Sequence, residues 1–333
     1  MTGLELLAAF VLIIGGAIGF TNAVEWLGKR MNLGAGAVGA LLAAVGTALP
    51  ESVIPVVALI GGGGQEAEDI AIGAIIGAPF LLGTLAMLLV VGSAHLFAGR
   101  REQGADVTGE PDATRRDLHW YLALMPIGIV LGVVSSSDGL RYAGAALLIL
   151  GYALYVRATV KGGGDADDEE ELDPLYFDTS KGDPPSTLQM VLQFVVSLAA
   201  IIAGAELFVS AVEHIAESAG ISPLVLALVL APLATEMPEK ANSVLWVRRG
   251  KDALALGNIT GAMTFQATIP VVLGLVFTDW KLEPQAVVAA VIGLFGGALA
   301  LWAIPRRRRV GLMPVVLWAG LFAGYVVYAA TTG

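Results

Sequence analysis

Two glutamates, Glu51 and Glu239, each follow a proline directly within long apolar stretches of this 333-residue chain. A carboxylate at membrane depth is costly unless it faces a cavity or a partner. The preceding proline removes a backbone donor and crowds the turn before it, which frees carbonyl oxygens. Hard cations such as Ca²⁺ prefer a shell made of oxygen. The pattern therefore favours a cation site; the alternative is a proline kink with a structurally paired acid.

The surroundings of these two acids occur twice in the chain. Residues Ile13–Ser52 align without a gap with Ile201–Lys240, so that a Thr-x-x-Pro-Glu pattern ends at Glu51 in one copy and at Glu239 in the other. Shared apolar composition explains some matches, but it does not readily produce this polar pattern at the same phase. We therefore expect the two acids to occupy equivalent positions.

The second copy carries two additional charges. Glu236 precedes Glu239 by three residues, so both can share one helix face, and Lys240 follows Glu236 by four in the favourable order for an ion pair. Two interpretations of Lys240 stay open. Its ammonium either occupies the place of a transported monovalent ion or neutralises an acid near a membrane surface.

The remaining signals are weaker. The segment GAIIGA at Gly73–Ala78 aligns with GNITGA at Gly257–Ala262, and these glycines allow close approach of helices. Only the second segment is rich in polar residues, among them Asn258, which is an accessory ligand candidate. Glu206 is a candidate gate or second acid.

The composition excludes several classes of protein. With 56% hydrophobic and 14% charged residues and a mean hydropathy of +0.77, the chain does not fit a soluble enzyme. The absence of cysteine excludes disulfides, thiolate zinc sites and iron–sulfur clusters. A net charge of −10 disfavours nucleic acid as a partner.

Long apolar stretches predict an all-α integral membrane protein with ten transmembrane helices, since about 20 apolar residues cross a bilayer as a helix. The expected helices lie near residues 4–27, 35–60, 70–97, 119–134, 142–160, 188–212, 222–247, 253–277, 285–304 and 311–330.

Lysines and arginines gather in alternate connections between these stretches. One side holds nearly all of them, while the other holds only Arg141 and Lys281. By the positive-inside rule, this predicts a multi-pass plasma-membrane protein with both termini outside and the acidic segment 161–187 in the cytoplasm. That segment is expected to be a solvated linker.

Each half of the chain holds five expected helices. Because five is odd, the second half enters the membrane from the opposite side, and the halves become inverted repeats. We expect a first repeat at 1–160 with its core at about 35–97, the linker at 161–187, and a second repeat at 188–333 with its core at about 222–277. Inverted repeats are typical of secondary transporters with a site near the midplane; the alternative is duplication kept for structure alone.

These motifs resemble the α-repeats of the sodium/calcium exchanger family, within the Ca²⁺:cation antiporter superfamily, as a divergent prokaryotic-type member. The first family signature, Gly-Thr-Ser-x-Pro-Glu, is matched by Gly46–Glu51 and by Ala234–Glu239. The second, Gly-Asn-x-x-Gly-Ser-Asn, is matched by Gly73–Pro79 and by Gly257–Met263. The ten-helix layout fits as well, so the resemblance covers nearly the whole chain.

The resemblance implies a ligand set. Glu51 and Glu239 would be the central Ca²⁺ carboxylates, Thr47 and Thr235 would supply oxygens at the helix breaks, and Gln266 would be an amide ligand. Several family ligands are replaced, and what remains suits fewer ions, or protons carried by the glutamates themselves. The positions of the family serines and asparagines hold Ala48, Glu236, Ala78, Ala262, Pro79 and Met263.

The sequence thus predicts a secondary active antiporter, not an enzyme, that exchanges Ca²⁺ against Na⁺ or H⁺ by alternating access. Inorganic cations and the lipid bilayer are its expected partners; no cofactor is expected, and nothing indicates a protein partner. The alternative is a transport-inactive membrane regulator or partner subunit that keeps the exchanger fold.

Overall fold

The computed structural model describes residues 2–30, 51–61, 64–107, 111–134, 137–162, 173–178, 185–304 and 310–332. Within these ranges all regular secondary structure is helical. The helices are α1 (Thr2–Arg30), a helix over 51–60, α3 (Gly64–Leu81), the π-helix η1 (Leu82–Ala86), α4 (Met87–Leu96), the 3₁₀-helix η2 (Ala98–Arg100), α5 (Pro111–Val133), α6 (Asp138–Gly162), α7 (Thr187–Ala219), α8 (Pro223–Arg248), α9 (Asp252–Gln266), α10 (Ile269–Phe277), α11 (Pro284–Ala303) and α12 (Leu312–Thr332).

Seven helical segments of the described chain are long and apolar enough to cross a membrane, as an all-helical membrane protein requires. They are Gly3–Val24, Gly64–Leu96, Asp138–Thr159, Thr187–Ala219, Asp252–Phe277, Pro284–Ala303 and Leu312–Thr332. Charged residues occupy the first two turns of α5 and the middle of α8, which makes these two helices less apolar. Of the second expected stretch, 35–60, the structure describes only the part from Glu51.

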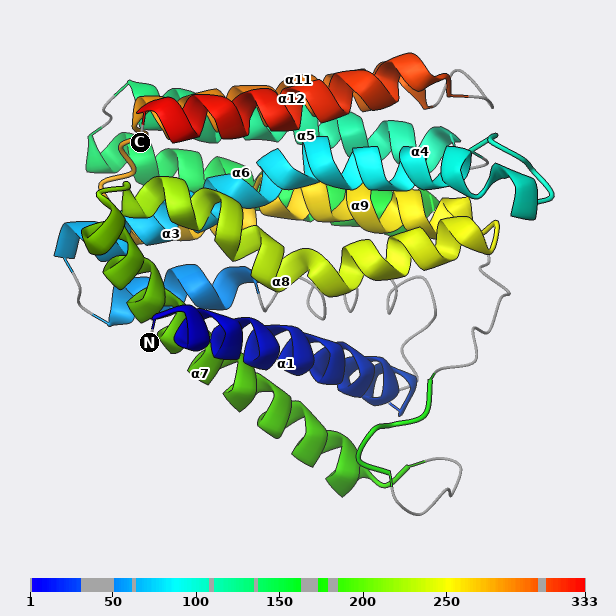
Figure 1. Ribbon diagram of the computed structural model, residues 1–333, viewed down its shortest axis with the longest axis horizontal. Helices are drawn as coiled ribbons and strands as arrows, with labels where there is room; N and C mark the ends of the chain where they lie inside the picture. Colours follow the sequence, from blue (N-terminus) through cyan, green and yellow to red (C-terminus); the bar gives the residue numbers. More distant parts are fainter. Residues whose placement is uncertain are drawn as a thin grey trace.

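The helices form one bundle in which α3 and α8 are central. α1 and α7 lie side by side along one edge, and α11 and α12 lie along the opposite edge (Figure 1). Two apolar clusters fill the interior, one around α1 and α7 and the other around α4, α5 and α9 to α12. Residues of α3 and α8 contribute to both clusters. The two termini lie at the same end of the bundle (Figure 1).

The contact between α1 and α7 is reciprocal. A Cβ added to Gly16 of α1 would lie 2.8 Å from Cγ1 of Ile201, and a Cβ added to Gly204 of α7 would lie 2.8 Å from Cγ1 of Ile13. The sequence repeat aligns Gly16 with Gly204 and Ile13 with Ile201. The same glycine–isoleucine contact therefore occurs twice with the two copies exchanged, as a two-fold relation between them requires.

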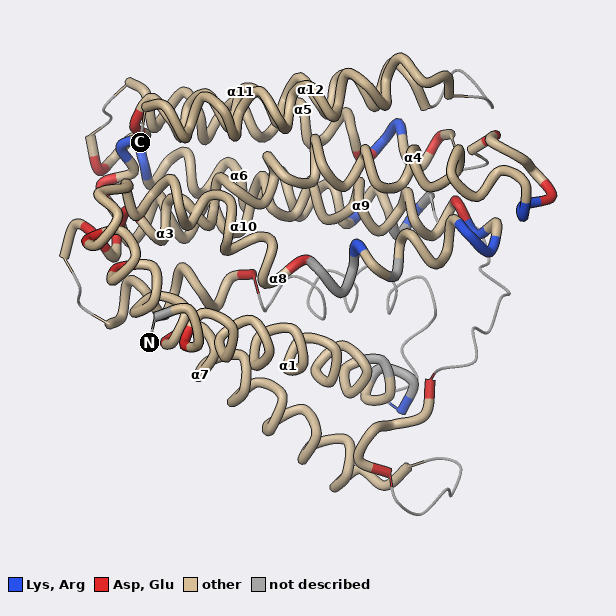
Figure 2. The backbone as a smooth tube through the Cα atoms, in the orientation of Figure 1, with Lys and Arg blue, Asp and Glu red and all other residues tan. Residues whose placement is uncertain are grey.

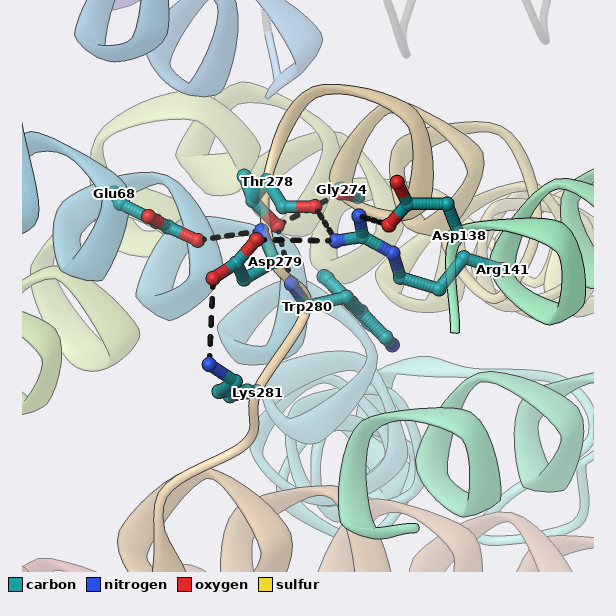
Figure 3. Close-up of polar contacts among 8 residues, drawn as sticks. All are labelled: Glu68, Asp138, Arg141, Gly274, Thr278, Asp279, Trp280 and Lys281. Carbon is teal, nitrogen blue, oxygen red and sulfur yellow. Dashed lines mark hydrogen bonds and ion pairs between the residues drawn. The ribbon is translucent and has the colours of Figure 1, made fainter. Parts of the chain in front are cut away.

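Lysines and arginines lie mainly at the end of the bundle opposite the termini (Figure 2). The two exceptions in the sequence pattern, Arg141 and Lys281, are neutralised locally (Figure 3). Arg141 pairs with Asp138 at 2.5 Å and donates to the carbonyl oxygen of Thr278, while Lys281 lies 3.3 Å from Asp279. The backbone N–H of Asp279 donates to Glu68 of α3, so this cluster joins the start of α3, the start of α6 and the segment after α10 (Figure 3).

Residues 173–178 of the acidic linker pack against α1 and α7. Trp26 donates its indole N–H to the carbonyl oxygen of Asp173 at 2.9 Å, and the backbone N–H of Phe177 donates to Gln193 at 2.9 Å. Leu175 is buried between Trp26 and Met190. This segment therefore bridges the two edge helices. The acidic residues 165–171 of the expected solvated linker lie outside the described residues.

We expect Leu175→Ala to release this bridge, because removal of a buried leucine side chain costs about 2 to 3 kcal/mol. Hydrogen exchange of the Phe177 amide should become at least about tenfold faster. The control is Tyr176→Ala, which removes a side chain that is 56% exposed. Equal protection of the Phe177 amide in both variants would show that Leu175 does not hold the segment.

Candidate cation-binding site

Two helices of the bundle are interrupted at positions that the sequence repeat relates. α3 passes into α4 through the π-helix η1 over Leu82–Ala86, and α9 ends at Gln266 before α10 begins at Ile269. The alignment of GAIIGA with GNITGA places Leu82 opposite Gln266. π-helical segments and helix breaks are frequent at functional sites.

The two interruptions share a threonine but differ in severity. Thr84 donates its hydroxyl to the carbonyl oxygen of Phe80 at 2.7 Å, and its counterpart Thr268 donates to that of Thr264 at 3.0 Å. Pro270 stands in the first turn of α10, where the first copy has Ala86. Because proline lacks a backbone donor, the helix breaks in the second copy, whereas the first copy only widens to a π-helix.

Glu236 and Lys240 are in direct contact in the middle of α8. Their side chains are 1% and 2% exposed, and the Lys240 ammonium donates a hydrogen bond to Oε2 of Glu236. The other oxygen, Oε1, is buried and accepts no hydrogen bond from the part of the chain that the structure describes. A buried carboxylate oxygen of this kind can bind a cation. The Glu236–Lys240 pair that the sequence pattern indicated can therefore contribute an oxygen ligand to a cation site.

The other expected ligands of the described chain are buried on three helices. Glu51 opens the helix over 51–60, Thr235 lies on α8 and Gln266 ends α9. Thr235 donates its hydroxyl to the carbonyl oxygen of Ala231 at 3.2 Å, which leaves its oxygen able to accept or coordinate. The side-chain nitrogen of Gln266 is buried and has no hydrogen-bond partner among the described residues.

Two expected ligands lie outside the described residues, namely Thr47 and the side chain of Glu239. In the part of the chain that the structure describes, no three His, Asp or Glu side chains form a metal-binding group. The ligand set deduced from the sequence therefore stays a prediction.

The accessory candidates lie at the margins. Asn258 is half-buried, and its amide donates to the hydroxyl of Ser243 on α8 at 3.4 Å, so it contributes to helix contact. Glu206 is exposed on α7 and lines an apolar cleft of about 570 Å³. Ser52 lines the same cleft, so Glu206 faces the helix that begins with Glu51.

A buried acid beside the break in the second copy was missed by reasoning from the sequence. Asp117 of α5 is 3% exposed; it accepts from the Thr260 hydroxyl at 2.9 Å and pairs with Arg116 at 3.1 Å. Its carbonyl oxygen accepts from Thr264 at 2.9 Å. Asp117 thus fixes two successive turns of α9 just before the break at Gln266. A stripe of threonines four residues apart on α9 is the signal that a polar partner was needed.

We expect Asp117→Leu to destabilise the protein by about 2 kcal/mol, because the Thr260 hydroxyl would remain buried without its acceptor. In detergent this should lower the melting temperature by roughly 4 to 8 °C. Asp112→Leu, which replaces an exposed acid of the same helix, is the matched control. The same melting temperature for both variants would contradict a positioning role for Asp117.

The comparisons with known proteins agree with this architecture. The model of the family described as sodium/calcium exchanger protein matches residues 3–161 and 190–331, on either side of the linker. The putative antiporter CaxA of Alkalimonas amylolytica is 26% identical over 314 residues, which cover 91% of this chain and 92% of the relative.

Two solved structures share the fold. The crystal structure of the H⁺/Ca²⁺ exchanger CAX superposes with a TM-score of 0.74 at 18% sequence identity. The match covers 100% of this chain and 82% of the CAX chain. The structure of the sodium–calcium exchanger NCX_Mj has a TM-score of 0.62 at 21% sequence identity. The match covers 98% of this chain and 99% of the NCX_Mj chain. The family match over most of the length carries the assignment. The chain therefore belongs to the sodium/calcium exchanger protein family, a family of membrane cation exchangers and not of enzymes.

Proposed function

We propose that the protein is a secondary active antiporter that exchanges Ca²⁺ against Na⁺ or H⁺ by alternating access. The observation that carries this proposal is the pair of repeat-related interruptions, η1 and the break between α9 and α10. Discontinuous helices at the interface between inverted repeats present backbone carbonyls to ions in known transporters. A buried Gln266 at the break supplies an amide beside them.

The proposed ligands are mostly hard oxygen donors, which suits Ca²⁺. They are Glu51, Glu236, Glu239, Thr47, Thr235 and Gln266, with Asn258 and Glu206 as accessory groups. The relative CaxA is named a putative antiporter, and CAX is named an H⁺/Ca²⁺ exchanger, which supports antiport of Ca²⁺ here. Alanines at positions 48, 78 and 262 leave fewer oxygens for additional monovalent ions.

We infer that the chain crosses the membrane ten times as two inverted five-helix repeats, at 1–160 and 188–333, joined by the linker 161–187. The reciprocal glycine contacts between α1 and α7 support the two-fold relation. Termini at one end of the bundle support an even number of crossings (Figure 1).

We further infer that this is a plasma-membrane protein with both termini outside. Lysines and arginines lie mainly at the end opposite the termini (Figure 2), which by the positive-inside rule is the cytoplasmic end. The linker 161–187 would then be cytoplasmic.

Glu51→Gln should reduce Ca²⁺ flux to less than about a tenth of the wild-type rate, because the neutral amide removes a charge that binds the cation. The assay follows Ca²⁺ in liposomes that contain the purified protein, first under a Na⁺ gradient and then under a pH gradient. Glu239→Gln should have the same effect. Glu102→Gln, at an exposed acid, is the control.

Full flux in both site variants would exclude the dicarboxylate site. A wild-type protein that moves no Ca²⁺ under either gradient would instead support the alternative, a transport-inactive regulator or partner subunit with the exchanger fold.

The orientation can be tested with single cysteines, because the chain has none of its own. Gly99 and Gly139 are exposed, and an added Cβ at either position meets no atom within 4 Å. In intact cells, a membrane-impermeant maleimide should label Gly139→Cys. Gly99→Cys should react only after the cells are permeabilised. The reverse pattern would place the termini in the cytoplasm.

A further inference from the structure

The buried pair of Glu236 and Lys240 occurs in only one half of the chain. The sequence repeat aligns these positions with Ala48 and Ser52. A charge pair in a low-dielectric interior pays a desolvation penalty that its mutual attraction often fails to offset, so it is weak evidence of a role in stability. Its contact in the middle of α8, next in sequence to Glu239, is better explained by a role in ion binding.

The other buried acids that pair with arginine lie near helix ends. Asp252 is the first residue of α9 and contacts Arg101 at 2.5 Å, while Asp117 lies in the second turn of α5 and contacts Arg116 at 3.1 Å. The Arg101–Asp252 pair joins the loop after η2 to α9, and Asp117 joins α5 to α9 by accepting a hydrogen bond from the Thr260 hydroxyl. The pair of Glu236 and Lys240 instead lies within one helix, so it does not serve to join two elements.

The Glu236–Lys240 pair carries no net charge, whichever of its two polar atoms holds the shared proton. Lys240 therefore cancels the charge of the additional carboxylate while Oε1 of Glu236 remains available as an oxygen ligand. The accessory acid Glu206 is exposed, so Glu51 and Glu239 are the two acids that are left to balance the transported ions. One Ca²⁺ balances them, and so do two monovalent cations.

We propose that Lys240 makes the exchange electroneutral, with one Ca²⁺ exchanged against two monovalent cations. This inference rests on the proposed function. A bilayer disfavours uncompensated charge. A site that is neutral with one Ca²⁺ and also with two monovalent cations can therefore switch between its outward-open and inward-open states with either set of ions bound. Without Lys240, a third carboxylate would need a third monovalent cation, and each cycle would then move one net charge.

The test measures the Ca²⁺ ratio reached across liposomes that contain the purified full-length protein. The counter-ion gradient is kept constant, and valinomycin with K⁺ gradients sets the membrane potential. A cycle that moves one net charge changes the equilibrium Ca²⁺ ratio about 50-fold per 100 mV. For the wild-type protein we expect a change of less than about twofold over the same range.

Two single variants should respond to the potential in opposite directions. Lys240→Met leaves the charge of Glu236 uncompensated, so each Ca²⁺ would exchange against three monovalent cations. Glu236→Gln leaves the ammonium uncompensated, so each Ca²⁺ would exchange against one. The double variant with both substitutions should again be insensitive to the potential. Lys281→Met, which removes an exposed lysine far along the chain from α8, is the matched control and should behave as wild type.

The outcomes separate the inference from the proposed function. Wild-type Ca²⁺ accumulation that follows the potential overturns the inference and leaves the antiporter standing, whereas no Ca²⁺ flux under any gradient contradicts the proposed function itself. Active single variants that ignore the potential show that Lys240 does not set the coupling. Inactive single variants together with an active double variant support the inference, because transport then requires that the charges at positions 236 and 240 balance. Loss of flux in the double variant as well overturns it.

Discussion

A charge inside a bilayer is costly unless another group compensates it, and this cost governs where polar side chains lie in the protein. Near the helix ends, Arg101 meets Asp252, and Arg141 meets Asp138 and the carbonyl of Thr278. These contacts join loops to helices. In the middle of α8, the compensation of Glu236 comes from the same helix. Charge balance is thus built into the region that also carries the proposed ion ligands.

The same environment restricts the backbone. An interrupted helix can exist at membrane depth only where the protein encloses it. Glycines provide that enclosure around η1, because a Cβ at Gly83 of η1 would lie 2.5 Å from the carbonyl oxygen of Gly293 of α11. Beside the break in the second copy, hydrogen bonds from Thr260 and Thr264 of α9 to Asp117 of α5 enclose the interrupted helix instead. The two halves therefore support their interruptions by different means, one through close packing and one through polar contacts.

Much of the architecture followed from one-dimensional patterns. The apolar stretches predicted the helices well, although the fourth begins at Pro111 instead of near residue 119 because charged residues extend it beyond the apolar part. The pattern of lysines and arginines predicted which end of the bundle is basic (Figure 2). The pair of Glu236 and Lys240 was predicted correctly because spacing along one helix decides that contact.

The sequence by itself determined the family, the helical membrane class and the repeat, because these depend on composition, periodicity and local motifs. Only the tertiary structure decided that Asp117 positions α9, that residues 173–178 bridge α1 and α7, and that Arg141 is buried among acceptors. These contacts join residues more than a hundred positions apart or depend on how a loop folds back. The reason is physical, since a side chain's partner across a bundle is set by helix packing, and no spacing along the chain encodes it.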